Sequence, residues 1–139
     1  ETIEIIPVAP RIIDVASAHI ALATSMGIIK QGNPDGFKTN RNNLWRKYSV
    51  DKLDTMKGTG WDVIHGGYNN DFARSDPNYA IPLDITREME GDSIIGMLYP
   101  HFYMTSGCNG AIPVMSGIGK EMAADMKAEG VDAVILTSA

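Results

Sequence analysis

Short apolar runs alternate along the chain with longer polar stretches. Residues 19–25 read His-Ile-Ala-Leu-Ala-Thr-Ser before a glycine loop, a pattern typical of a central strand that opens into a loop. Residues 61–68 predict a second short strand that ends in a glycine turn, and residues 94–98 predict a third. The final segment, residues 130–139, indicates a turn followed by a buried parallel strand. The pattern therefore predicts four strands.

Two segments carry helical signals instead. Residues 82–90 begin with a proline and are followed by Gly91, which predicts a helix with proline in its first turn. Residues 114–129 predict an amphipathic helix that ends at Gly130. Its apolar face repeats every four residues at Val114, Ile118, Met122 and Met126. Because parallel neighbours need crossover connections, we expect an α/β fold with three layers, a largely parallel sheet and helices on both faces.

The remaining segments give weaker signals. Residues 1–16, around Pro7, predict a connector or edge segment leading in from sequence outside this chain, and residues 17–139 predict one α/β domain. Residues 30–60 are polar, contain the turn-forming run Gly32-Asn33-Pro34-Asp35-Gly36 and show no sustained periodicity. A stretch of that length within a compact domain is usually functional or mobile.

Composition narrows the class of protein. The 139 residues are 44% apolar and 21% charged, as in a globular domain, and suffice for one domain with a sizeable core. The net charge of −5 argues against nucleic acid or an anionic membrane as the main partner, and no apolar stretch is long enough to span a bilayer. A single cysteine, Cys108, excludes an internal disulfide framework and favours the cytoplasm.

Candidate chemistry is densest at His65-Gly66-Gly67-Tyr68. The glycines allow close backbone approach, and His65 could donate a hydrogen bond to a carboxylate, although a tight turn with a hydrogen-bonded histidine explains the same residues. Residues 24–27 and 107–110 are small polar passages that either bind anions through backbone amides or are ordinary loops. No His or Cys spacing predicts a metal site, and Cys108 is either a reactive thiol or inert.

Five motifs then occur in an order that resembles the selenoprotein subunit of component B of the glycine, sarcosine and betaine reductases. They are Gly32-Asn33-Pro34-Asp35, His65-Gly66-Gly67-Tyr68, Ile81-Pro82-Leu83-Asp84, Phe102-Tyr103-x-Thr105-x-Gly107 and the closing strand Gly130 to Ser138. From about Ser17 to Ala139 the chain resembles the carboxy-terminal half of that subunit. The second and fifth motifs also resemble the selenoprotein subunit of D-proline reductase.

The resemblance implies a mechanism. In that family, selenocysteine-x-x-Cys-x-x-Cys begins one residue after the Leu-Thr-Ser of the closing strand, so a selenocysteine is expected directly after Ala139. We therefore expect a fragment without its own catalytic residue or cofactor, cut by an in-frame UGA codon or by choice of boundary. The selenolate would displace the amine from the substrate α-carbon and leave a carboxymethyl selenoether. A pyruvoyl group on a partner subunit would activate primary and secondary amines, and selenoprotein A would accept the carboxymethyl group.

For the substrate pocket we expect His65, Gly66, Gly67 and Tyr68, because they follow a predicted strand end and form a family motif. Residues expected behind them are Thr24, Ser25, Tyr103 and Thr105. Three functions stay open at this point: a truncated reductase subunit, a stand-alone α/β domain that binds a small carboxylate or amine, and a structural or assembly module. The sequence does not distinguish glycine, sarcosine and betaine, because these differ at nitrogen.

Overall fold

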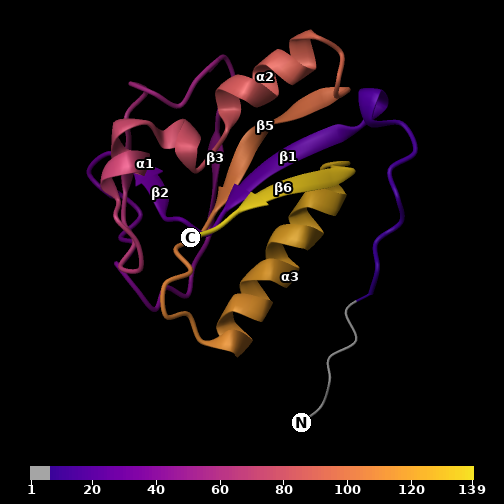
Figure 1. Ribbon diagram of the computed structural model, residues 1–139. Helices are drawn as coiled ribbons and strands as arrows, with labels where there is room; N and C mark the ends of the chain where they lie inside the picture. Colours follow the sequence, from indigo (N-terminus) through magenta and orange to yellow (C-terminus); the bar gives the residue numbers. More distant parts are fainter. Residues whose placement is uncertain (1–6) are drawn as a thin grey trace.

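The computed structural model describes residues 7–139 and contains a four-stranded main sheet in the order β3-β5-β1-β6 (Figure 1). Its strands are β1 (His19–Thr24), β3 (Arg46–Ser49), β5 (Met97–Met104) and β6 (Ala133–Thr137). β1 runs parallel to both β5 and β6, whereas β3 is antiparallel to β5. The largely parallel sheet is thus confirmed, with β1 central as predicted.

The other elements lie around this sheet. Strands β2 (Ile28–Lys30) and β4 (Trp61–Val63) form a separate antiparallel pair. The helices are α1 (Asp71–Ser75), α2 (Leu83–Gly91) and α3 (Ile112–Ala128), and short 3-10 turns occupy Val15–Ser17 and Pro77–Tyr79. The predicted helices at 82–90 and 114–129 are confirmed as α2 and α3. No helix among the described residues is both long and apolar enough to cross a membrane.

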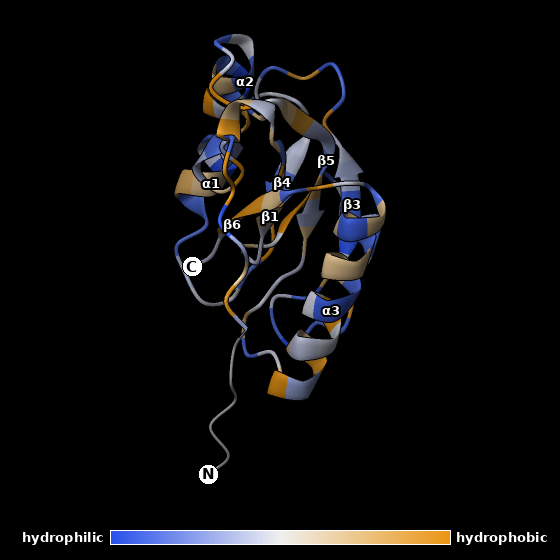
Figure 2. Cartoon of the chain, turned by 90° about the vertical axis from the view of Figure 1, so that its right-hand side faces the viewer, coloured by the Kyte–Doolittle hydropathy of each residue, from blue (hydrophilic) through white to orange (hydrophobic). Residues whose placement is uncertain are grey.

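Alternation along β1 shows how the layers form. Ile20 and Leu22 pack into a cluster that includes residues of α1 and α2, whereas Ala21 and Ala23 pack on the other face against α3. Successive side chains of a strand point to opposite faces, so the two faces receive different cores. Each buried Leu or Ile contributes roughly 1.5–3 kcal/mol of burial energy. The sheet lies between α1 and α2 on one side and α3 on the other, which confirms the three layers (Figure 2).

Gly130 ends α3 in the way the sequence predicts. The residue has a φ of +73°, and its amide donates to the carbonyl of Lys127 at 3.2 Å. The amide of Val131 donates to the carbonyl of Met126 at 3.0 Å. This pair of bonds is a Schellman motif, which favours glycine because the left-handed conformation crowds a Cβ atom. The reversal starts β6 three residues later.

The predicted aperiodic loop at residues 30–60 is wrong over part of its length, because β3 lies within it. Only Tyr48 of β3 is buried, and Arg46 and Ser49 are exposed. A strand with one core residue carries almost no apolar alternation. Its existence depends instead on pairing with β5, some fifty residues away in sequence, which local patterns do not encode.

The boundaries of two other predicted strands also differ. The strand expected at 94–98 is β5, which begins at Met97 and continues to Met104 beyond Pro100. Pro100 lies where the β1–β5 register shifts between Leu98 and Phe102, a bulge-like irregularity at which proline is tolerated, and its carbonyl accepts a bond from the amide of Val50 at 2.9 Å. The strand expected at 61–68 is shorter and pairs antiparallel with β2. The five-residue helix α1 was not predicted.

The closing strand is parallel to β1, as predicted, but the expectation that it is buried is wrong. β6 is an edge strand, and Leu136 is 68% exposed. Residues 7–14 form neither helix nor strand. The first six residues of the predicted connector lie outside the described residues.

Candidate functional site

The carboxyl ends of β1, β5 and β6 meet at one edge of the sheet. Thr24 and Thr137, which end β1 and β6, are joined by a 2.8 Å hydrogen bond from the Thr137 hydroxyl to the Thr24 hydroxyl. The amide of Ser25 donates to the carbonyl of Thr137, and the amide of Thr105 donates to the carbonyl of Thr24, each at 3.1 Å. Ligand sites of open parallel sheets form at this edge.

Gly27 brings the histidine turn to this edge. It has a φ of +73°, and a Cβ atom built on it would lie 2.1 Å from the carbonyl oxygen of Ile64. The amide of Ile64 donates to the carbonyl of Gly27 at 2.8 Å, so the two backbones are in direct contact. The hydroxyl of Tyr68 donates to the carbonyl of Met26 at 3.0 Å. Residues 64–68 are therefore fixed beside the loop that follows β1.

His65 is held as a neutral hydrogen-bond donor. Its side chain is buried, with 7% of the residue exposed, and Nδ1 accepts a hydrogen bond from the amide of Gly67 at 3.0 Å. An accepting Nδ1 leaves the ring proton on Nε2. Burial lowers the pKa of His65, and burial raises the pKa of the adjacent Tyr68 to about 12. A neutral imidazole that donates through Nε2 suits a carboxylate or another anion.

Cys108 lies against the glycine turn. A Cβ atom on either Gly66 or Gly67 would lie 3.4 Å from the Cys108 sulfur. The amide of Gly66 donates to the carbonyl of Thr39 at 2.8 Å, and the amide of Arg41 donates to the carbonyl of Cys108 at 2.9 Å. Three loops that are far apart in sequence therefore lie together, and the side-chain-free turn leaves the thiol close to its backbone.

The loop after β5 connects this cluster to the end of β1. The amide of Gly107 donates to the carbonyl of Ser25 at 2.9 Å. The hydroxyl of Thr105 donates to the carbonyl of Leu44 at 3.0 Å, so its side chain positions the loop of residue 44. Ser106 is fully buried, and its hydroxyl has no hydrogen-bond partner within residues 7–139. Ser25 and Thr105 thus both lie at the sheet edge, next to the Cys108 loop.

A cavity of about 380 Å³ lies beside this cluster. Its lining residues are Arg41, Asn42, Asn43, Asn109, Ala111 and Val114. Arg41 and Asn109 have φ values of +54° and +52°, conformations that cost energy for residues other than glycine and often mark functional sites. The first turn of α3 opens onto the cavity without a side-chain cap. A guanidinium beside the positive end of a helix favours a carboxylate or another small anion.

Comparison with known proteins places this chain in a family. Residues 1–139 match the family model described as glycine/sarcosine/betaine reductase selenoprotein B. The chain belongs to this family. It is 39% identical over 127 residues to the glycine reductase complex component B subunit gamma of Peptoclostridium litorale, covering 91% of this chain and 29% of that protein. It is 34% identical over 133 residues to the betaine reductase complex component B subunit beta of Peptoclostridium acidaminophilum, covering 96% and 30%.

The predicted relation to D-proline reductase is also confirmed. Subunit gamma of that enzyme from Acetoanaerobium sticklandii is 38% identical over 77 residues, which cover 55% of this chain and 32% of that protein. No solved structure matches this chain. The chain spans about three tenths of the length of the component B relatives that it matches. Reductases with different named substrates therefore share this segment.

Tyr103 lies apart from the histidine turn. Its side chain is on the face of the sheet that α3 covers, where its hydroxyl donates to Asp125 at 2.6 Å and its ring stacks on Trp45. Burial raises the pKa of Tyr103, and the bond to Asp125 raises it further. Lys47 also donates to Asp125, at 2.7 Å. Tyr103 therefore holds α3 against the sheet.

The other predicted residues are brought together. Thr24, Ser25 and Thr105 follow one another around the sheet edge through backbone bonds, and the glycine turn packs beside them. Arg41 was missed because it lies in the aperiodic stretch. Asn109 lies within residues 107–110, which the sequence predicts either to bind anions through backbone amides or to form an ordinary loop. Within residues 7–139, no three His, Cys, Asp or Glu side chains are grouped as metal ligands.

Proposed function

We propose that this chain is part of the selenoprotein subunit of a cytoplasmic glycine, sarcosine or betaine reductase, which reductively removes the amine from its substrate. The observation that carries the proposal is the meeting of three strand ends with a neutral His65 and the Arg41 cavity. A donor and a cation within one cluster suit a small carboxylated substrate. The names of the relatives support the same class of enzyme.

The nucleophile in this proposal is a selenocysteine directly after Ala139, as the resemblance of the closing strand implies. The turn after β6 would begin beside Ser25, whose carbonyl anchors Gly107 of the Cys108 loop. The glycines at positions 66, 67 and 107 let the loops at this strand end pack closely, because a Cβ atom on each would lie 3.0–3.2 Å from a neighbouring atom. The selenolate would displace the amine from the α-carbon to give a carboxymethyl selenoether. The proposed partners are a pyruvoyl-containing subunit, which would activate the amine, and selenoprotein A.

The residues of this chain would bind and orient the substrate. Arg41 and the amino end of α3 would hold the carboxylate, and His65 would donate from Nε2 to an anionic oxygen. Glycine, sarcosine and betaine share that carboxylate and differ only at nitrogen. Reductases named for different substrates share this segment, and a site in it for the common carboxylate agrees with that.

Amine release by the purified reductase complex tests the binding role. Loss of a charge-assisted hydrogen bond is worth about 1.5–3 kcal/mol, so Arg41→Gln should raise KM by about 10- to 100-fold. We expect kcat to change much less, because the carboxylate is held in both the ground state and the transition state. The control is Arg11→Gln, which removes an exposed cation from the connector. Equal KM values for both variants would contradict the carboxylate site.

A second experiment separates the reductase from a stand-alone binding domain, which a cavity with a cation in its lining would also suit. Mass spectrometry of the intact native subunit should find selenocysteine directly after Ala139, followed by two cysteines three residues apart. Sulfur-only sequence there, combined with glycine or betaine binding in calorimetry that Arg41→Gln abolishes, would establish the binding domain. With neither selenium nor binding, an assembly module would be the better description.

A further inference from the structure

β6 has the composition of an interior strand and the position of an edge strand. On one side it pairs with β1 over its whole length, and no described strand pairs with its other side. Val134, Ile135 and Leu136 are 44%, 39% and 68% exposed. Consecutive apolar residues supply both faces of a strand, a pattern typical of parallel strands that are covered on both faces.

An apolar groove borders this edge on the α3 side. It has a volume of about 170 Å³ and is lined by Ala23, Gly119, Met122, Ala123, Met126, Val134 and Leu136. Val134 and Leu136 are two residues apart and so share one face of β6. They pair in register with Ala21 and Ala23, whose side chains also face α3. The helix therefore covers β1 and leaves the outer half of β6 open.

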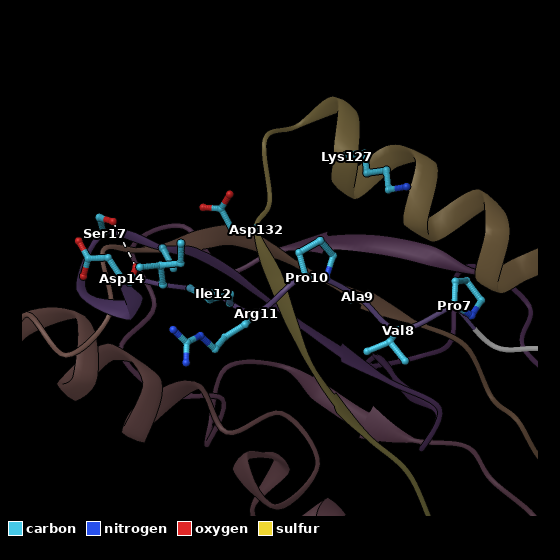
Figure 3. A pocket seen from close by; sticks show the side chains of 12 residues that line it. Pro7, Val8, Ala9, Pro10, Arg11, Ile12, Asp14, Ser17, Lys127 and Asp132 are labelled. Carbon is cyan, nitrogen blue, oxygen red and sulfur yellow. Dashed lines mark hydrogen bonds between the residues drawn. The ribbon is translucent and has the colours of Figure 1, made fainter.

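The connector leaves a second opening near the start of β6. Residues 7–14 border a cavity of about 760 Å³ that Lys127 and Asp132 also line (Figure 3). The connector is itself apolar and exposed, with Val8 and Ile13 at 95% and 89%. Exposed apolar side chains on both the connector and the free strand indicate that another chain segment covers them.

We propose that the free edge of β6 is the docking site for a further parallel strand from the rest of the selenoprotein B subunit. The component B relatives are more than three times as long as the matched segment, so the family supplies ample chain for it. Parallel pairing extends the β5-β1-β6 order, and parallel sheets are covered on both faces. A strand there, with a helix over the groove beside α3, covers Val134, Ile135 and Leu136. The proposal depends on family membership and not on the reductase chemistry.

The test uses the intact subunit and the substitution Leu136→Lys. If the edge is covered, a lysine at position 136 is buried without a partner, and we expect the thermal midpoint to fall by at least about 5 °C. Ile85→Lys is the matched control on the outer surface of α2, where Ile85 is exposed, and it should change the midpoint by less than about 1 °C. Equally small shifts for the two variants would overturn the proposal.

A second measurement keeps the proposal testable if Leu136→Lys does not fold. Alternate amides of a strand point toward its two neighbours, so a covered β6 protects all its amides from hydrogen exchange in the unsubstituted subunit. Fast exchange at every second β6 amide would overturn the proposal. Dimerisation of the intact subunit through this edge would also overturn the proposal. In that case Leu136→Lys would dissociate the dimer to monomers and leave the thermal midpoint unchanged.

Discussion

The two edge strands of the main sheet differ in composition. β3 closes one edge with Arg46, Lys47 and Ser49, and its only buried side chain is Tyr48. β6 closes the other edge with apolar residues that are exposed. Charged side chains on an edge strand discourage pairing with other chains, whereas an apolar parallel edge invites it. The contrast agrees with the proposal that β6 pairs with a further strand, and it gives no such reason to expect a partner for β3.

The charges of β3 also fasten the strand to its surroundings. Lys47 donates to Asp125 and to Tyr99, so a residue of the sheet edge holds α3. Burial tends to lower the pKa of Lys47, but its bonds to these groups outweigh burial and raise it. Arg46 pairs with Asp35 at 2.8 Å. Within residues 7–139, β6 makes no ion pair; beyond its pairing with β1, the Thr137 hydroxyl donates to the carbonyl of Ala80. The two edges should therefore respond differently to substitution and to acid.

The largest expected effect is self-association of residues 1–139 in isolation. The uncovered β6 should pair with other copies, and the average mass in sedimentation should rise with concentration in the micromolar range. Leu136→Lys should keep the chain monomeric, because a charge on the edge opposes strand pairing. Ser49→Lys on β3 is the control and should leave the association unchanged. A chain that stays monomeric at all concentrations would remove the contrast between the edges.

A smaller effect is expected at the fastening of β3. Asp125→Ala removes the acceptor of both Lys47 and Tyr103, so the free energy of unfolding should fall by about 2 kcal/mol. Glu129→Gln, at the C-cap of the same helix, loses only a 3.3 Å contact of an exposed carboxylate, and should cost about 0.5 kcal/mol. Denaturant unfolding measures both values. Equal losses would show that the two carboxylates are interchangeable and that the Tyr103 bond contributes nothing.

The smallest expected effect is a loss of stability at acid pH. Of the two edges of the sheet, only the β3 edge should show it. The Tyr48 hydroxyl, followed by Arg46, lowers the pKa of Asp35 below its ordinary value of 3.8. The unfolded chain therefore binds this proton first, so stability is complete above about pH 5 and is lost as pH falls through the lowered pKa. Asp35→Asn should flatten the decline of the thermal midpoint between pH 5 and 3. The exposed Asp51→Asn should leave that slope as it is; identical slopes for the two variants would disprove the role of Asp35.

The sequence predicts the parts of the fold whose signals are local. β1 is a continuous apolar run, and α3 repeats Ile118, Met122 and Met126 on one face before a glycine, so each element can be found from its own residues. β3 could not be found in this way, because its stability comes from β5 and from Asp125 on α3. The exposure of β6 was missed for the same reason. Its apolar residues indicate that the strand suits a buried environment, but they do not show whether another strand lies beside it.

Some residues of the candidate site could also be predicted from a local pattern, and others could not. His65, Gly66 and Gly67 form a local motif, so their turn could be singled out before its surroundings were known. Alternation would have separated Tyr103 from Phe102, since neighbours along a strand face opposite sides, and the two residues do pack into different cores. Arg41 carries no such signal, because its place beside Cys108 depends on one backbone bond between distant loops.

The contact between Gly27 and Ile64 also limits which residues this chain can carry at position 27. Any side chain at position 27 would overlap a main-chain oxygen, which no rotamer change relieves. A descendant that loses this glycine must therefore first displace the 64–67 turn, and with it the imidazole of His65. The position of the imidazole therefore depends on the absence of one side chain, 38 residues earlier in the sequence.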